Sequence, residues 1–522
     1  MKPNRALLPL PLSLLPSLSF AQSSSSPTDC SSSLTASYAA PSVASGFAAR
    51  LVAQDLDRPR SIRFDSAGNL LVVEQGRGGV TGLRLRDSGE GAACVEVDER
   101  VDVTEDGDLN HGLELSPDGT TLYASSPSEV LSWPYDADSL STTSDDPRTL
   151  VANMASGGHS TRTLLLSRQV PGLLLVSRGS DGNIDEDTRS ISSGRSQIRV
   201  FDLNATAEAD EPYDYTDGAV LGWGLRNSVG VGEYPGDQGG VWSVENSVDE
   251  LERADEDIHQ DNPGEELNFH GPLNASADAA SDRFGANFGY PDCFAAWEVE
   301  DIPENGELRV GTQFAIGDLD EDDDDDDGVD DEVCAEDRTA PRLTFAAHTA
   351  PLDIVFDEAG ETAWITFHGS WNRDDPDGYR LSAVRFSPDT AQPLADPTST
   401  EAAIPIMSNP DLSACPDGCF RPVGLAFDAR GRLFMSSDAT GEIYVVVRTD
   451  EDEGSVEEGG VPTGLGPSET TGDAAAPSET GDEGDEEDEG AAAAVMVMGS
   501  GRSGVVWAVV GLGALVGGWL VL

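Results

Sequence analysis

Lysine is almost absent from this sequence of 522 residues, and the single one, Lys2, lies in a segment that we expect to be removed. A mature chain without lysine has no side chain for a Schiff base, for a pyridoxal phosphate linkage or for the lysine of a P-loop. Any anion that the protein binds must therefore be held by arginine, histidine or backbone N–H groups. The positions at which arginine recurs therefore indicate where an anion could bind.

Positive charge as a whole is scarce, because 31 Lys and Arg residues face 96 Asp and Glu residues, which gives a net charge of −65. Nucleic acid is excluded as a partner, since its phosphates would be repelled at long range. Much of the acid lies in an insert at residues 318–332 and in a tail at residues 450–489. We expect both runs to be solvated, as blocks of like charge usually are.

The two ends of the sequence predict secretion and attachment to the cell surface. Residues 1–21 combine basic residues, an apolar stretch and a small-residue end, as a signal peptide does. Sequons at Asn204 and Asn274 predict a glycoprotein. Residues 505–522 are apolar and long enough to cross a bilayer. This tail favours a GPI-attachment signal, with a plain membrane tail anchor as the alternative, and residues 449–494 read as an acidic Gly/Ser/Pro-rich stalk.

Six cysteines, an even number, fit an oxidising compartment in which disulfides form. Six cysteines allow fifteen connectivities, so several pairings are open. Their positions suggest a small loop closed by Cys415 and Cys419, a staple by Cys293 and Cys334 at the base of the acidic insert, and a remaining pair of Cys30 and Cys94.

One sequence motif recurs between residues 47 and 448. It consists of an apolar residue, a turn rich in Asp, Pro and Gly, and a short run of strand-forming residues. The first three copies are evenly spaced at about 50 residues, near the period of propeller blades. Six copies predict an all-β fold, a six-bladed β-propeller whose closed ring removes exposed strand edges. A β-sandwich with long loops is the alternative. The copies begin at Phe64, Leu115, Leu166, Glu233, Phe356 and Phe427.

Polar residues recur at one position of the repeat, a few residues before each turn. Since one phase of each blade corresponds to one height in the ring, we expect these residues to meet at one mouth of the central channel. The guanidinium group of an arginine can donate two parallel hydrogen bonds to one carboxylate. A mouth with several arginines therefore suits a planar ligand with several carboxylates. The residues are Arg60, Asn110, His111, His159, Arg162, Arg226, Asn227, His348 and Arg421, with His368 and Trp371 from the motif "FHGSWNR".

The motifs "PRSIRFDSAGNLLVVEQG", "LNHGLELSPDG", "GLRNSVG", "FHGSWNR" and "RPVGLAFDARGRLFMSSDATGEIY" lie in this order between about residues 42 and 448. They resemble the glucose/sorbosone dehydrogenases, and most closely the fungal pyranose dehydrogenases that depend on pyrroloquinoline quinone. The resemblance implies a six-bladed propeller over residues 42–448, pyrroloquinoline quinone at its mouth and a bound Ca²⁺ ion. It also implies an extracellular oxidoreductase for pyranose sugars, such as aldoses or sorbosone-type ketoaldoses.

The same resemblance implies a role for each motif residue. His159 would be the general base that takes the proton of a sugar hydroxyl while hydride passes to the quinone. Arg226 would stabilise the negative charge that develops on the quinone oxygen. The carbonyl oxygens of Ser247 and Val248, in "VENSVDEL", would bind calcium. The implied cofactor ligands are Arg60, Asn110, His111, Arg226, Asn227, His368, Trp371 and Arg421.

Two departures and two alternatives accompany this reading. Bacterial relatives place a lysine against the quinone, so His368 or Arg421 must supply that charge here. No haem domain is recognisable, so we expect the electrons to pass to a separate redox protein or a small quinone. A propeller hydrolase of the lactonase type would need a calcium ion held by carboxylate and amide side chains, whereas we expect a mostly cationic or amide mouth. A non-catalytic surface propeller is the other alternative.

Overall fold

The computed structural model describes most of the region in which the repeats occur. The predicted signal peptide, stalk and C-terminal tail fall outside the described residues, as does most of the acidic insert. Within the described part of the chain, no helix is long and apolar enough to span a membrane. The described residues are 30, 33–105, 107–155, 157–206, 211–236, 239–274, 285–316 and 329–449.

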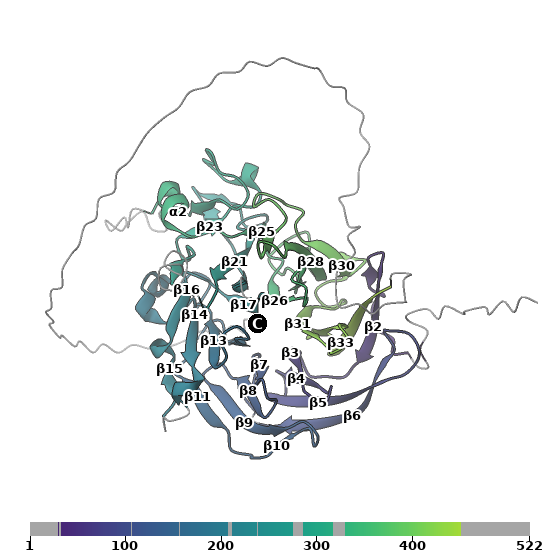
Figure 1. Ribbon diagram of the computed structural model, residues 1–522. Helices are drawn as coiled ribbons and strands as arrows, with labels where there is room; N and C mark the ends of the chain where they lie inside the picture. Colours follow the sequence, from purple (N-terminus) through teal and green to yellow (C-terminus); the bar gives the residue numbers. More distant parts are fainter. Residues whose placement is uncertain are drawn as a thin grey trace, which may run out of the picture. The chain divides into compact units, whose positions relative to one another are not determined.

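Six sheets of four to six strands are arranged around a common centre, and this confirms the all-β, six-bladed propeller. The innermost strands of the six sheets contact one another in a closed cyclic order, and Figure 1 shows most of them around the centre of the ring. Each of these strands begins one blade, numbered 1 to 6 along the chain. The inner strands are β3 (Pro59–Phe64), β7 (Leu113–Leu115), β12 (Leu164–Leu166), β17 (Ser228–Glu233), β26 (Pro351–Phe356) and β31 (Pro422–Phe427).

The other strands of each blade follow outward from the inner strand, mostly in antiparallel order. Blade 1 continues with β4 (Leu70–Glu74), β5 (Gly79–Asp87) and β6 (Val95–Thr104). Blade 2 continues with β8 (Thr121–Ser125), β9 (Val130–Asp136), β11 (Arg148–Ala152) and β15 (Tyr213–Asp214), and β10 (Ser141–Thr142) pairs with β9. Blade 3 continues with β13 (Leu173–Arg178), β14 (Gln197–Asp202), β16 (Ala219–Trp223) and β22 (Ala286–Asn287).

The second half of the ring has the same order. Blade 4 continues with β18 (Val241–Glu245), β21 (Glu265–Gly271) and β25 (Leu343–Phe345). Blade 5 continues with β27 (Thr362–Phe367), β28 (Arg380–Ser387), β30 (Ile404–Ser408) and β1 (Ser42–Val43), and β29 (Gln392–Pro393) pairs with β28. Blade 6 continues with β32 (Leu433–Ser437), β33 (Glu442–Arg448) and β2 (Phe47–Ala53).

The repeated sequence motif forms the hairpin between the first and second strands of each blade. In blade 1, Asp65 Oδ1 accepts hydrogen bonds from the N–H groups of Ala67 and Asn69, and Gly68 takes a φ of +83° that favours glycine. Asp357 and Asp428 accept equivalent backbone N–H groups in blades 5 and 6. In blades 1, 5 and 6 a short Asp-x-x-Gly turn therefore fixes where the inner strand ends and the next strand begins.

The hydrophobic core lies between the faces of neighbouring blades. Val72 of blade 1 belongs to one buried cluster with Phe434 of blade 6, while Val73, its neighbour on β4, packs with Leu122 of blade 2. Successive side chains of a strand point to opposite faces of the sheet, so one strand contributes to two such clusters. No blade buries both of its faces alone, and the closed ring is required for the core to form.

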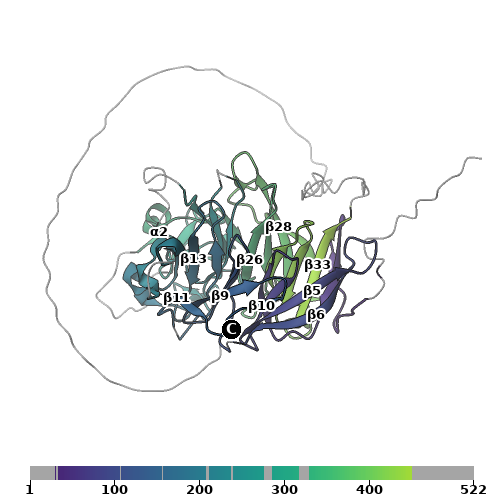
Figure 2. The ribbon, with the colours of Figure 1, turned by 60° about the horizontal axis from the view of Figure 1, so that its bottom comes forward.

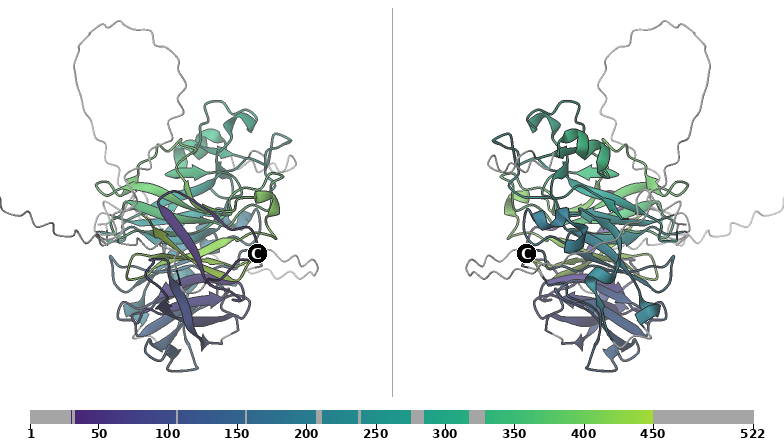
Figure 3. Two further views of the ribbon diagram at one scale, coloured as in Figure 1. Left: turned by 90° about the vertical axis from the view of Figure 1, so that its right-hand side faces the viewer. Right: turned by 90° about the vertical axis from the view of Figure 1, so that its left-hand side faces the viewer.

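A strand from the start of the described chain completes the last blade. β2 pairs in antiparallel register with β33, and Phe47 lies opposite Arg448. Figure 1 shows the purple strand β2 beside the yellow-green strand β33, and purple and yellow-green strands also lie side by side in the views of Figures 2 and 3. The ring is thereby closed by hydrogen bonds between two segments that are remote in the sequence. The repeats alone did not predict this pairing.

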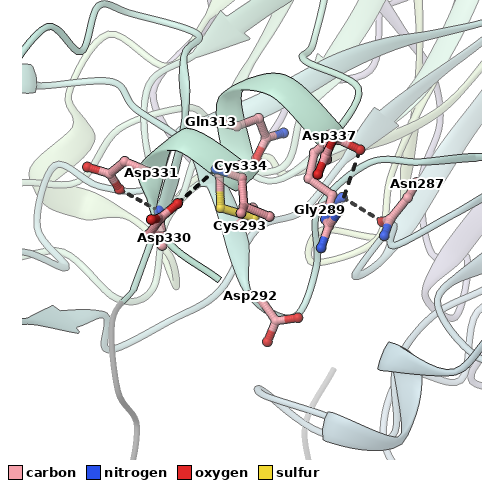
Figure 4. Close-up of a disulfide and its surroundings, with 12 residues drawn as sticks. Asn287, Gly289, Asp292, Cys293, Gln313, Asp330, Asp331, Cys334 and Asp337 are labelled. Carbon is pink, nitrogen blue, oxygen red and sulfur yellow. Dashed lines mark hydrogen bonds between the residues drawn. A yellow bond between two sulfur atoms is a disulfide. The ribbon is translucent and has the colours of Figure 1, made fainter. Parts of the chain in front are cut away.

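The long segment between β21 and β25 forms an insertion in blade 4. It carries β23 (Cys293–Ala295), which pairs with β24 (Gln313–Ala315), and α2 (Asp331–Asp337). In Figure 1, α2 and β23 lie outside the ring of inner strands. A disulfide between Cys293 and Cys334 joins β23 to α2, as Figure 4 shows. The other short elements are β19 (Glu252–Arg253), β20 (Glu256–Asp257), α1 (Leu203–Thr206) and the 3-10 turns Glu186–Arg189, Ile191–Ser193, Tyr215–Asp217, Val299–Asp301 and Leu412–Ala414.

All three disulfides have the pairing that the cysteine positions suggested, Cys30–Cys94, Cys293–Cys334 and Cys415–Cys419. Their loops differ widely in length, since the paired cysteines are 64, 41 and 4 residues apart. A cross-link stabilises mainly by restricting the unfolded chain, and the effect grows with the length of the closed loop.

Opening the Cys293–Cys334 bridge is therefore expected to destabilise the protein markedly. Replacing both cysteines by serine should lower the free energy of unfolding by about 4 kcal/mol, against about 2 kcal/mol for the same replacement at Cys415 and Cys419, from the chain entropy of the two loops. Urea unfolding followed by tryptophan fluorescence measures both values. Equal losses for the two pairs would contradict the entropic explanation.

Candidate active site

The polar residues predicted from the repeat phase lie where the inner strands begin, at the end of the ring that we call the mouth. Arg60 is the second residue of β3, and the inner strands of other blades begin shortly after His111, His159, Arg226 and Arg421. Their side chains meet in two groups, each organised around one buried or partly buried aspartate. We call these groups the Asp438 cluster and the Asp249 cluster.

The Asp438 cluster joins residues of four blades. Arg60 Nη1 lies 2.7 Å from Asp438 Oδ2, and His368 Nε2 lies 2.8 Å from Asp438 Oδ1. Arg60 Nε also donates to His111 Nδ1 at 3.3 Å. Burial alone would raise the pKa of Asp438, but His368 and Arg60 lower it well below its ordinary range. Asp438 therefore stays ionised and holds two of the predicted cofactor ligands in place.

Arg421 belongs to the same cluster but pairs with no carboxylate of the described residues. Its Nε and Nη2 donate to the carbonyl oxygens of His368 and Gly369 at 3.2 and 3.1 Å, and its guanidinium lies 5.6 Å from the ring centre of Tyr379. Burial lowers the pKa of Arg421. Asp438, whose charge acts on Arg421, is already bound by Arg60 and His368. Since a buried cation without a paired anion is costly, this arrangement favours an anionic ligand.

The Asp249 cluster is formed by residues of blades 3, 4 and 5. Arg226 Nη2 lies 2.8 Å from Asn183 Oδ1 and 3.2 Å from Asp249 Oδ2. His348 Nδ1 approaches Asp249 Oδ1 at 3.4 Å. Burial opposes protonation of His348, yet Asp249 and Glu265 raise its pKa above the ordinary value. Asp249 thus orients one guanidinium and one imidazole toward the same part of the mouth.

His159 stands beside Arg226 in this cluster. Burial, with the positive charge of Arg226 as the second cause, lowers the pKa of His159 to about 3, so the imidazole is neutral at ordinary pH. Its Nδ1 lies 3.0 Å from Ser180 Oγ. A Cβ at Gly179 would lie 2.8 Å from His159 Cβ and 2.7 Å from Asn227 Oδ1. Only glycine at this position lets His159 and Asn227 approach so closely.

Two contacts join the clusters across the mouth. Asn110 Nδ2 donates to the carbonyl oxygen of Ser160 at 2.9 Å, next to His159. The N–H of His368 donates to the carbonyl oxygen of Ala350 at 2.9 Å, close to His348. Asn110 Oδ1 is buried and has no hydrogen-bond partner among the described residues. The structure therefore brings predicted residues from all six blades into one connected region that retains an unused buried acceptor.

The backbone at Ser247 and Val248 fits a hard cation. The N–H of Ser247 donates to Glu265 Oε2 at 2.7 Å, and Glu265 Oε1 accepts the N–H of Ala350 at 3.1 Å. The carbonyl oxygens of Ser247 and Val248 accept no hydrogen bond from the described residues. Ca²⁺ takes six to eight oxygen ligands, of which backbone carbonyls are a common type. Two carbonyls leave most positions to a bound molecule or to water.

The expectation of a mostly cationic or amide mouth is incomplete, because carboxylates are interleaved with the arginines. Asp438, Asp249 and Asn183 were not among the site residues predicted from the sequence. Asp438 lies inside the motif "RPVGLAFDARGRLFMSSDATGEIY", and Asp249 lies inside "VENSVDEL". Both acids therefore belong to motifs that were recognisable in the sequence, but the residues that they contact were not predictable. Among the described residues there is no group of three or more His, Cys, Asp or Glu side chains that could hold a metal ion.

Trp371 is in neither cluster. It lies on the loop that follows β27 and is 58 % exposed. Arg373, two residues further along the same loop, anchors it. Its Nη2 lies 2.9 Å from Asp261 Oδ1, and its Nη1 donates to the carbonyl oxygen of Ala347 at 3.4 Å. The indole is therefore presented to solvent on an anchored loop that starts at the mouth.

Comparison with known proteins places the chain in a family. The TrAA12-like family model matches residues 41–449. A pyrroloquinoline quinone-dependent sugar dehydrogenase of Hypocrea jecorina (strain QM6a) is 47% identical over 419 residues, which are 80% of this chain and 92% of the relative. A pyrroloquinoline quinone-dependent pyranose dehydrogenase of Coprinopsis cinerea is 38% identical over 425 residues, 78% of this chain but 54% of that longer relative.

Two solved structures share the fold closely. The calcium structure of a Trichoderma reesei member of Carbohydrate-Active Enzymes Family AA12 has a TM-score of 0.75 and 48% identity, covering 80% of this chain and 100% of that one. The holo form of the pyrroloquinoline quinone domain of Coprinopsis cinerea pyranose dehydrogenase has a TM-score of 0.71 and 35% identity, covering 80% and 99%. The chain belongs to the TrAA12-like family, together with the fungal pyrroloquinoline quinone-dependent sugar and pyranose dehydrogenases.

Proposed function

We propose that the protein is an extracellular oxidoreductase that oxidises pyranose sugars with pyrroloquinoline quinone and Ca²⁺ at the mouth of its propeller. The observation that carries this function is the buried guanidinium of Arg421, which has no carboxylate partner among the described residues and lies in the cluster of Arg60 and His368. The relatives named above, one of which is matched over 92% of its length, use the same cofactor by name. The three disulfides support an oxidising compartment.

The donors at the mouth suit a flat tricarboxylate. When bound, pyrroloquinoline quinone supplies the two-electron acceptor that no amino acid side chain offers. Arg421, Arg60 and His368 would hold its carboxylates, and in a chain with one lysine Arg421 would supply the charge that a lysine provides elsewhere. Asn110 and Asn227 would hydrogen bond to its polar edge, and the buried Oδ1 of Asn110 is available as an acceptor. The cofactor ligands remain Arg60, Asn110, His111, Arg226, Asn227, His368, Trp371 and Arg421.

The chemistry on the sugar falls to His159 and Arg226. A neutral imidazole can accept the proton of a sugar hydroxyl as the C–H hydrogen leaves with its electron pair, and the low pKa keeps His159 neutral. Arg226 is held by Asn183 and Asp249, so its guanidinium needs no reorganisation to stabilise developing negative charge. The exposed indole of Trp371 provides an apolar face against which a pyranose ring can stack.

Calcium would lie at the carbonyl oxygens of Ser247 and Val248, in a segment that the Glu265 carboxylate anchors through the Ser247 N–H. The electron acceptor would be a separate redox protein or a small quinone. A C-terminal membrane or GPI anchor is part of the proposal for localisation. A lactonase-type hydrolase is less well supported, because no metal site of three or more acidic or histidine side chains occurs in the described ranges.

An activity assay tests the proposed function. Purified protein is incubated with pyrroloquinoline quinone and Ca²⁺, and the reduction of an artificial dye is followed with a panel of pyranoses. We expect turnover with at least one pyranose, none without the quinone, and loss on chelation of calcium. A protein that binds the quinone yet oxidises no pyranose would contradict the substrate class, and one that turns over without quinone would contradict the cofactor.

The pH dependence of turnover follows from the pKa of His159. A general base must be neutral, and a pKa of about 3 keeps the imidazole neutral above that pH. We therefore expect no loss of kcat/KM through His159 between about pH 7 and about pH 5. In Arg226→Gln the repulsion is gone, so the acid limb should move toward neutral pH. An acid limb near pH 6.5 in the wild-type protein would show that His159 titrates as an ordinary histidine.

A further inference from the structure

Ser180 hydrogen bonds to two members of the Asp249 cluster, His159 and Arg226. It is fully buried after β13, and its N–H donates to the carbonyl oxygen of Arg226 at 2.8 Å. Its carbonyl oxygen accepts the N–H of His159 at 3.0 Å. Ser180 Oγ lies 3.0 Å from His159 Nδ1 and 2.7 Å from the carbonyl oxygen of Gly182. One serine is thus bonded to both residues that the proposed chemistry uses.

The carbonyl oxygens that contact Ser180 and His159 constrain the positions of their protons, and the side chain of Tyr290 also lies within hydrogen-bond reach of Ser180. The carbonyl oxygen of Gly182 can only accept, so the hydroxyl proton of Ser180 is donated there. Ser180 Oγ must then accept from His159 Nδ1. The carbonyl oxygen of Ser180 lies 3.2 Å from the same Nδ1 and can also only accept. Both contacts therefore require the proton of the neutral imidazole to sit on Nδ1.

We propose that Ser180 is a positioning residue that holds His159 as the Nδ1–H tautomer, with the lone pair of the ring on Nε2. This inference rests on the proposed function of His159 as the base. In the reaction, the O–H bond of the sugar hydroxyl breaks and its proton forms the Nε2–H bond. Pyrroloquinoline quinone, when bound, would supply the two-electron acceptor for the hydrogen and electron pair that leave the sugar carbon, so that the sugar would be oxidised as the quinone is reduced.

The same contacts favour the product of this proton transfer. In the imidazolium both ring nitrogens carry protons, and the Nδ1–H still donates to Ser180 Oγ and to the Ser180 carbonyl oxygen. No side chain has to rotate when the charge forms, which is the condition for efficient proton transfer. The bond from the Ser180 N–H to Arg226 also fixes the spacing between His159 and Arg226. Ser180 acts through His159 and does not itself touch the reacting atoms.

The tautomer can be read directly from ¹⁵N chemical shifts. The protein is labelled with ¹⁵N-histidine, its six histidines are observed with and without bound quinone and calcium, and His159 is assigned from the signal lost in His159→Ala. We expect a protonated Nδ1 and an unprotonated Nε2. A protonated Nε2 in the neutral wild-type ring would overturn the proposal, whether or not the protein turns over any sugar.

A variant tests the role in turnover. Ser180→Ala should lower kcat by about 3- to 10-fold, the weight of one net hydrogen bond, with KM nearly unchanged and with a mixture of tautomers at His159. Ser243→Ala is the matched control, since Ser243 Oγ lies 2.8 Å from His270 Nε2 in a buried serine–histidine pair of blade 4, and it should keep the wild-type kcat. An unaltered tautomer and kcat in folded Ser180→Ala would overturn the positioning role.

Discussion

Replacing His159 by alanine is expected to lower kcat by about 10²–10⁴-fold, the usual weight of a positioned general base, while pyrroloquinoline quinone still binds. The physical reason is that the proton of the sugar hydroxyl then has no neutral acceptor beside Arg226. Stopped-flow or steady-state dye reduction measures kcat, and the absorbance of the bound quinone measures occupancy. Cofactor affinity should change little, because the cationic Asp438 cluster is intact in this variant.

His270→Gln is a suitable control for this change. His270 is also a buried histidine with a pKa that burial lowers to about 3, but it lies on β21 and bonds to Ser243. It takes no part in either cluster at the mouth, so kcat per folded molecule should stay at the wild-type value. Wild-type turnover in His159→Ala would remove the base assignment. Equal losses in the two variants would point to general destabilisation.

Arg421→Gln should raise the dissociation constant for pyrroloquinoline quinone by about 30- to 300-fold, since removing one partner of a buried charge pair costs at least about 2 kcal/mol. The free energy of unfolding of the cofactor-free protein should not fall, because a buried guanidinium without a carboxylate partner is itself unfavourable. Loss of affinity without loss of stability distinguishes a ligand-binding cation from a structural one. Isothermal titration and urea unfolding supply the two values.

Arg432→Gln controls for the removal of an arginine from the same blade. Arg432 lies at the opposite end of β31, in the hairpin before β32, and pairs with Asp428 and Asp87 at 2.6 and 3.0 Å. Its loss should leave the affinity for the quinone unchanged and lower stability slightly, as for other partly exposed ion pairs. An Arg421→Gln variant that binds the quinone as tightly as Arg432→Gln would contradict the placement of a cofactor carboxylate at Arg421.

The fold was predictable because its signal is local. The turn at Asp65 and the turns at Asp357 and Asp428 each hold a hairpin with contacts that span only a few residues. Repetition of this local unit gives the number of blades, and the phase of the repeat gives the end of the ring at which Arg60 and Arg421 meet. These features need no knowledge of which blade lies next to which.

The contacts that complete the site depend on the closed ring and were not predictable. Arg60 and Asp438 are joined only because blade 6 returns to blade 1, across 378 positions of sequence. Likewise β2 finds β33 only once the ring exists. Asn183 reaches Arg226 from a loop of blade 3 whose sequence carries no repeat signal. The cations were visible in the sequence, whereas the acids and amides that orient them became visible only in three dimensions.

The measurement that tests the account most directly is an equilibrium titration of the protein with pyrroloquinoline quinone, with and without Ca²⁺. If guanidinium and imidazole groups from separate blades hold one flat tricarboxylate at the mouth, the titration will show one saturable site per chain. Calcium will tighten it, and Arg421→Gln and Arg226→Ala will each weaken it. Absence of saturable binding, or an affinity that neither substitution changes, would contradict the account.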